Sequence, residues 1–116
     1  MTFDELAKKR CLPCEGGIPP LSPEEVSSLL ATLPDWKLTS DGKRIRREWN
    51  AKHFVAGMEF IDKVAKLAEE EQHHPDLHLT EYRNLAIELW THAVNGLTES
   101  DFIVAAKINL LPIRKS

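Results

Sequence analysis

The sequence lacks any apolar run of the roughly 18–20 residues that a membrane-spanning helix needs. Its first residues lack the apolar core of a secretory signal peptide and the Arg- and Ser-rich composition of a transit peptide. An excess of positive charge is also missing, because the formal net charge is −3. We therefore expect a cytoplasmic protein that has no membrane segment and does not bind nucleic acid directly.

Cysteine is scarce, and both residues fall in the single motif Cys11-Leu-Pro-Cys14. A zinc site needs about four ligands, and no second cysteine pair completes one. A thioredoxin-like site needs a preceding strand and a following helix, but the surrounding prolines and glycines indicate a loop. We expect two reduced thiols, and a metal or disulfide role is the less favoured alternative.

The common catalytic fingerprints are absent as well: the sequence contains no G-x-S-x-G, no phosphate-binding loop and no dinucleotide-binding motif. What the sequence does contain is 116 residues that are 42% hydrophobic and 28% charged. These values are typical of one globular domain with a modest core.

Hydrophobic periodicity predicts a short N-terminal helix followed by a helix, two strands, a long helix, two strands and a last helix. The second helix has strong start signals, because Ser22 can cap it, Pro23 suits its first position and Glu25 completes a capping box. Thr98 and Asp101 form a second capping box. The predicted helices are residues 1–10, 22–33, 51–72 and 98–110.

Two tight turns join the strands in pairs, one at Asp41-Gly42 and one at 82–84. The predicted strands are 36–39, 44–49, 77–81 and 85–92. Strands joined by tight turns are antiparallel, and their alternating faces suggest that only one side is covered. We expect an α+β fold, with a single antiparallel four-stranded sheet and helices packed on one face.

The stretch most suggestive of function is residues 69–75, Glu-Glu-Glu-Gln-His-His-Pro, at the predicted end of the long helix. Carboxylates are unfavourable at a helix C-terminus, where the dipole is already negative. If the helix continues, Glu69 and His73 are four residues apart and share a face, so Glu69 could orient the imidazole. His92 ends the last predicted strand and could lie beside them, giving a pair suited to general acid–base catalysis.

Simpler interpretations stay open for each residue. A Glu–His pair at this spacing is more often a surface ion pair worth under about 1 kcal/mol. A zinc or iron site could draw on His73, His74, His92 and Glu69, but consecutive histidines rarely reach one ion. Four other residues are expected to be structural or solvated, namely His53, His78, Glu70 and Glu71.

In these motifs the chain resembles the pterin-4a-carbinolamine dehydratase family. The resemblance rests on Glu69-x-x-x-His73-His74-Pro75, on Thr91-His92 at the strand end, and on Gly96-Leu97-Thr98-x-x-Asp101. It covers about residues 22–110, so we divide the chain into an N-terminal extension, 1–21, and a dehydratase-like domain, 22–116.

The resemblance implies a lyase that dehydrates 4a-hydroxytetrahydropterin to quinonoid dihydropterin without a metal or an organic cofactor. This reaction recycles the cofactor of aromatic amino-acid hydroxylases. The resemblance also implies a homodimer or homotetramer. The alternative is a dimerisation or coactivator module whose catalytic site is vestigial, and a metal-dependent hydrolase is a weaker third possibility.

The resemblance also implies roles for individual residues. The catalytic set is His73, His74, His92 and Glu69, with no metal ligands. The substrate-binding set is Gln72, Pro75, Trp90, Thr91, Ala93 and Asp101. Two positions depart from the family pattern, because Leu77 stands where an aromatic residue is frequent and Gln72 where an acidic residue is frequent.

Overall fold

The computed structural model describes residues 1–11 and 19–115, so Cys14 lies outside the described residues. The elements in chain order are α1 (Phe3–Lys8), α2 (Pro23–Leu30), β1 (Lys37–Leu38), β2 (Ile45–Asn50), α3 (Phe54–Glu71), β3 (Asp76–Thr80), β4 (Asn84–Leu89), a 3₁₀ turn η1 (His92–Val94) and α4 (Glu99–Asn109).

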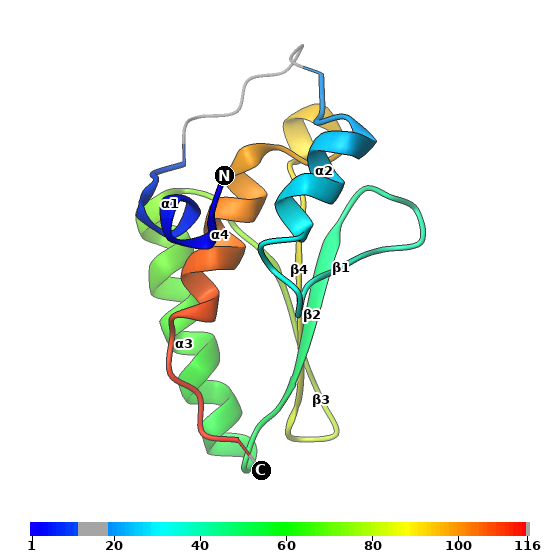
Figure 1. Cartoon of the computed structure of the whole chain (residues 1–116). Coiled ribbons are helices and arrows are strands. Elements are labelled where there is room, and N and C mark those ends of the chain that lie inside the picture. Colours follow the sequence, from blue (N-terminus) through cyan, green and yellow to red (C-terminus); the bar gives the residue numbers. More distant parts are fainter. Residues whose placement is uncertain (12–18, 116) are drawn as a thin grey trace.

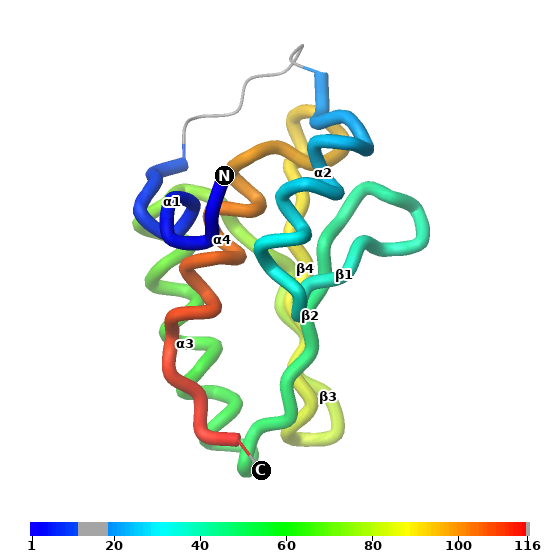
Figure 2. The backbone as a smooth tube through the Cα atoms, in the orientation of Figure 1, coloured from blue at the N-terminus to red at the C-terminus, as the bar shows by residue number. Residues whose placement is uncertain are grey.

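The four strands form one sheet in the order β1-β2-β4-β3, and each neighbouring pair is antiparallel. In the central pair Ile45 lies opposite Leu89 and Trp49 opposite Leu85. Figure 1 shows α3 and α4 side by side against one face of this sheet, and Figure 2 traces the same path through the backbone. The predicted α+β fold with a four-stranded antiparallel sheet is confirmed.

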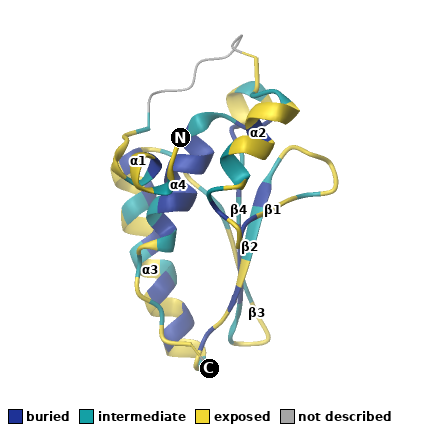
Figure 3. Ribbon diagram, viewed as in Figure 1, coloured by how far each residue is buried: buried dark blue, intermediate teal, exposed yellow. Residues whose placement is uncertain are grey.

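The core lies between this face of the sheet and the two long helices (Figure 3). Leu85, Ile87 and Leu89 of β4 are buried, as their alternation predicted. Phe60 of α3 packs on Trp49 of β2 with ring centroids 5.2 Å apart. Each such side chain, fully buried, contributes about 1.5–3 kcal/mol to the free energy of unfolding.

Local sequence signals account for several of the element ends. The predicted capping box of α2 is present, with Ser22 and Glu25 each accepting a hydrogen bond from the other's backbone N–H. Gly42 has φ +72°, the left-handed conformation that the predicted hairpin turn requires. Gly57 of α3 faces Leu79 of β3 so closely that an added Cβ would lie 3.3 Å from a Leu79 methyl carbon, which explains a glycine inside the helix.

Two predicted element ends are wrong for identifiable reasons, and the long helix ends within one residue of its prediction. Asn50 does not cap the long helix, because it is still paired with Asn84 in the sheet; the cap is His53, whose Nδ1 accepts from the Ala56 N–H at 3.1 Å. The helix ends at Glu71 rather than at residue 72. β4 ends at Leu89 rather than at His92, because its partner β2 begins at Ile45, opposite Leu89.

Among the described residues, no helix has the length and apolar character needed to cross a membrane.

Opposite charges pair on the sheet face that the helices leave open. Glu88 accepts hydrogen bonds from Arg44 at 3.2 Å and from Arg46 at 2.8 Å, and its side chain is only 15% exposed. Burial alone would raise the pKa of Glu88, but the bonds from Arg46 and Arg44 outweigh it and lower the pKa.

A Glu88→Gln variant should therefore lower the free energy of unfolding at pH 7 by roughly 1–3 kcal/mol. Because the folded-state pKa is depressed, this stabilisation is present above the unfolded-state pKa and is lost as pH falls through the folded value. Urea unfolding between pH 7 and pH 3 should show the two proteins converging in stability. Glu48→Gln, which removes an exposed partner of Arg46, is the matched control and should change stability little. A gap that stays constant with pH would contradict this account.

Candidate active site

His73 lies just beyond the end of α3, on a segment that leaves the helix axis. Gln72 adopts a left-handed conformation with φ 51°, and the His73 N–H then donates to the Ala68 carbonyl at 3.2 Å. This reversal ends α3, and Pro75 follows within three residues. His73 is thereby turned towards α4, and its side chain is 11% exposed.

The partner of His73 is Asp101. His73 Nε2 lies 2.6 Å from Asp101 Oδ1, and the Asp101 side chain is completely buried. An ionised carboxylate only accepts hydrogen bonds, so with Asp101 ionised the proton of this contact belongs to Nε2, and Nδ1 is left to take up or release a proton. A buried carboxylate that fixes the tautomer and orientation of an imidazole is the arrangement found in hydrolase triads.

Asp101 is itself held by its second oxygen. Oδ2 accepts from the Thr98 N–H at 2.9 Å and from the Thr91 hydroxyl at 2.8 Å. The first bond belongs to the predicted capping box, because Asp101 is the third residue of α4. The second bond ties α4 to the segment that carries His92, so one carboxylate connects His73 with the residue before His92.

His92 is exposed and lies in η1 rather than in a strand. Thr91 pairs with Gly96 across this short turn, and its N–H donates to the Gly96 carbonyl at 2.8 Å. The Trp90 ring lies against the His92 ring, with centroids 4.0 Å apart. Trp90 also contacts Arg44, whose guanidinium carbon lies 4.5 Å from the centroid of the Trp90 ring. The buried Trp90 indole N–H has no hydrogen-bond partner among the described residues.

The predicted pairing of Glu69 with His73 is wrong. Glu69 Oε1 instead lies 3.5 Å from Nε2 of His74, and both side chains are largely exposed. The physical reason is the left-handed Gln72, which breaks the helical spacing before His73 is reached. The structure thus separates the two histidines: His73 lies mostly covered against Asp101, whereas His74 faces solvent beside Glu69.

Glu71 was expected to be solvated, and that expectation is wrong. Its side chain is 5% exposed and accepts from Lys107 Nζ of α4 at 3.1 Å and from the Cys11 N–H at 2.9 Å. Helical spacing could have predicted the burial of Glu71, because this residue continues the stripe of α3 that contains the buried Val64 and Ala68. Glu70 is exposed, as expected.

The remaining predicted site residues lie around these groups. Gln72 and Ala93 are exposed and Pro75 is half-buried, each adjacent in sequence to one of the site histidines. Among the described residues, no three His, Cys, Asp or Glu side chains converge in an arrangement that could hold a metal ion. The absence of a metal from the reaction stays a prediction.

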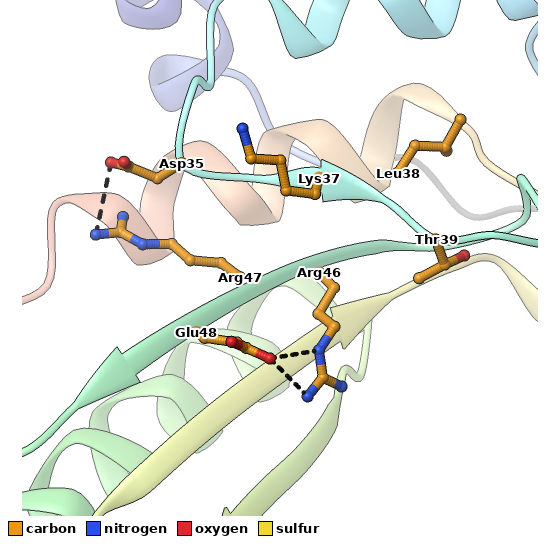
Figure 4. A pocket seen from close by; sticks show the side chains of 7 residues that line it. All are labelled: Asp35, Lys37, Leu38, Thr39, Arg46, Arg47 and Glu48. Atoms are coloured by element: carbon orange, nitrogen blue, oxygen red, sulfur yellow. Dashed lines mark hydrogen bonds and ion pairs between the residues drawn. The ribbon is translucent and has the colours of Figure 1, made fainter.

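One surface hollow lies elsewhere, on the β1–β2 hairpin (Figure 4). It measures about 410 Å³, and Figure 4 shows two ion pairs within its lining, Asp35–Arg47 and Arg46–Glu48. Most of the charged side chains that line this hollow therefore pair with one another. The His73–Asp101 contact lies instead where the end of α3 meets the start of α4.

Comparison with known proteins matches this chain to one family. The family model described as pterin 4 alpha carbinolamine dehydratase matches residues 19–111. A protein of Nitrosospira multiformis, provisionally named a pterin-4-alpha-carbinolamine dehydratase, is 46% identical over 110 residues, which are 95% of each chain. Pterin-4-alpha-carbinolamine dehydratase 2, mitochondrial, of Arabidopsis thaliana is 43% identical over 94% of this chain, and the match spans 60% of the plant protein.

A solved structure is similar as well. The protein described as a transcriptional coactivator/pterin dehydratase from Brucella melitensis superposes with a TM-score of 0.73 at 31% identity, covering 78% of this chain and 95% of that one. Together, the family match over residues 19–111 and the bacterial relative that aligns along 95% of the chain show that this chain belongs to the pterin 4 alpha carbinolamine dehydratase family.

Proposed function

We propose that this chain is a dehydratase that converts a 4a-hydroxytetrahydropterin to the quinonoid dihydropterin by general acid–base catalysis. Membership of the family supports the reaction. The observation that supports assigning the reaction to particular residues is the 2.6 Å contact between His73 and the buried Asp101. This contact gives an oriented imidazole at the edge of the fold. The role is recycling of a pterin cofactor, and the pathway would include an aromatic amino-acid hydroxylase.

The reaction needs two proton transfers. One proton must reach the 4a-hydroxyl so that the C4a–O bond breaks and water leaves. The ring nitrogen lone pair forms the new double bond, and the proton on that nitrogen must then be removed. We assign removal to His73 Nδ1, because the Asp101 carboxylate stabilises the imidazolium that forms. His92 supplies the proton to the hydroxyl in the earlier step, and the Trp90 ring orients the His92 imidazole. None of these steps requires a metal or an organic cofactor.

The other residues bind the pterin in this proposal. His74 polarises the ring system, with Glu69 beside it. Gln72, Pro75, Trp90, Thr91 and Ala93 contact substrate, and Asp101 closes the site while it holds His73.

Glu69→Gln should affect the reaction only modestly. The Glu69–His74 pair is exposed, and such pairs contribute about 1 kcal/mol or less. The variant should lower kcat/KM by no more than about fivefold. Glu70→Gln, at an exposed neighbouring position, is the control and should leave kcat/KM unchanged. A loss of 100-fold or more in Glu69→Gln would mean that Glu69 reaches the reacting histidine in the substrate complex.

The proposed function is tested by following a freshly generated 4a-hydroxytetrahydropterin with and without the protein. The absorbance of the quinonoid product should rise faster with protein, in proportion to protein concentration. A rate equal to that of buffer would overturn the dehydratase proposal and favour the alternative, a binding module with a vestigial site.

Self-association is part of the proposal, as a homodimer or homotetramer. Phe54, Val55 and Met58 lie exposed near the start of α3, and apolar groups clustered on a surface often mark association sites. A cytoplasmic location and the division at residue 22 stay predictions. The plant relative carries the word mitochondrial in its name, and Leu6 from the proposed extension is fully buried in the core.

A further inference from the structure

The first eleven residues reach the two helix ends that carry the His73–Asp101 pair. The Cys11 N–H donates to Glu71 Oε1 at 2.9 Å, and the Cys11 thiol donates to the Ser100 carbonyl at 3.6 Å. Glu71 is two residues before His73, and Ser100 immediately precedes Asp101. Cys11 thus lies between the last turn of α3 and the first turn of α4.

Glu71 is the point at which these contacts meet. One carboxylate oxygen accepts from Cys11 and the other from Lys107 of α4 at 3.1 Å. Burial alone would raise the pKa of Glu71, but the Cys11 N–H and Lys107 outweigh it and lower the pKa, so the carboxylate is charged at neutral pH. A buried charge at a helix C-terminus is unfavourable unless it is bonded, and here both oxygens are bonded.

The Cys11 thiol serves as a structural donor. Burial, with Glu71 nearby, raises the pKa of this thiol to about 12, so it stays protonated and unreactive at neutral pH. That protonation state preserves its bond to the Ser100 carbonyl.

The N-terminal segment is anchored at two further places. Leu6 of α1 is 0% exposed, and α1 packs against α4, beside which it lies in Figure 1. Lys9 forms an ion pair with Glu99, the first residue of α4. The segment therefore contacts Glu99 and Ser100, the two residues that precede Asp101.

The position of His73 needs such support. It follows the left-handed Gln72, outside the regular helix, so helical hydrogen bonds do not fix it beyond its own N–H bond to Ala68. A shift of about 1 Å in a reacting group can cost on the order of 100-fold in rate.

We propose that residues 1–11 and Glu71 form a clamp that positions His73 against Asp101. The clamp locks the end of α3 to the start of α4, and Glu71 is its central positioning residue. This inference rests on the proposed function for its catalytic consequence. The clamp also gives a role to residues 1–11, which lie outside the residues matched by the family model, 19–111.

The first test compares Glu71→Ala and Glu71→Gln with Glu59→Gln. Glu59 pairs with Arg114 on the exposed side of α3. Glu59→Gln therefore also removes an ion pair made by α3, but at a position outside the clamp. Glu71→Ala should lower kcat about 10-fold or more with little change in KM. Glu71→Gln keeps an acceptor for Cys11 and should recover part of the loss, and Glu59→Gln should match the wild type.

The second test measures coupling. If Glu71 acts through the His73–Asp101 contact, Glu71→Ala should lose most of its effect in an Asp101→Asn background, where that contact is already altered. An equal fold-loss in both backgrounds, or an unchanged kcat in Glu71→Ala, would overturn the clamp and leave Glu71 a purely structural residue.

The third test addresses α1. Leu6→Ala and Leu33→Ala remove the same side chain from fully buried positions, and only Leu6 belongs to the clamp. In folded protein, Leu6→Ala should lower kcat several-fold more than Leu33→Ala. Equal effects of the two variants would overturn the role of residues 1–11.

A proton NMR measurement keeps the clamp testable if the wild type proves inactive. The His73 Nε2 proton bonded to Asp101 should give a downfield signal that persists in the wild type and in Glu59→Gln and broadens or vanishes in Glu71→Ala. An unchanged signal in Glu71→Ala would overturn the clamp. An inactive wild type with a Glu71-dependent signal would reject the proposed function alone and support the clamp.

Discussion

A His73→Ala variant is expected to lose 10²- to 10⁴-fold in kcat/KM for pterin dehydration, the range typical of a general acid–base group. His73 is the one imidazole that the structure pairs with a buried carboxylate, among the residues described. Its removal deletes the proposed base and leaves Asp101 without its imidazole. The side chain is 11% exposed, so circular dichroism and urea unfolding should accompany the kinetics.

His78→Ala is the matched control for this variant. His78 lies exposed on β3, so the same chemical change there should leave kcat/KM within about twofold of the wild type, as surface substitutions rarely matter. His92→Ala should resemble His73→Ala in size, because it deletes the proposed acid. A folded His73→Ala protein that reacted at the wild-type rate would contradict the proposed mechanism.

Replacement of Asp101 should have the largest combined effect on activity and stability. Asp101→Ala removes three hydrogen bonds made by a fully buried carboxylate, to His73, Thr91 and the Thr98 N–H. Loss of the cap costs about 1 kcal/mol, and each buried partner left unsatisfied costs about 1–3 kcal/mol. The free energy of unfolding should therefore fall by roughly 3 kcal/mol or more, measured by urea denaturation.

Asp101→Asn separates the two consequences. The amide can still cap α4, so the loss of stability should be smaller than in Asp101→Ala. Its NH₂ group can donate to His73 Nε2, which would place the histidine proton on Nδ1, the wrong nitrogen for a base. Activity should then fall by on the order of 10²- to 10⁴-fold, as for a mis-set tautomer in a catalytic triad.

Glu25→Ala is the control for the capping function. Glu25 holds the same position in the α2 capping box but is exposed. It should cost about 1 kcal/mol or less in stability and leave activity unchanged. If Asp101→Asn kept full activity, the carboxylate charge would have no part in catalysis.

Sequence reasoning was most accurate where structure depends on neighbours along the chain. The capping boxes at Ser22 and Thr98, the Asp41-Gly42 turn and the alternation in Leu85–Leu89 are all decided within a few residues. Strands connected by such tight turns then pair in the antiparallel orientation. The element order, the sheet and the α+β class were therefore predictable, whereas the site assigned to residues 69–75 stays a prediction.

The sequence by itself determined the fold class, and the histidines that it marks for the site stay a prediction. Only the tertiary structure decided their partners. His73 pairs with Asp101, 28 residues away, rather than with Glu69, and Glu71 is buried by Lys107 and Cys11. These contacts form because sheet pairing and core packing bring the end of α3 to the start of α4, and a one-dimensional spacing rule carries no information about which helix ends meet.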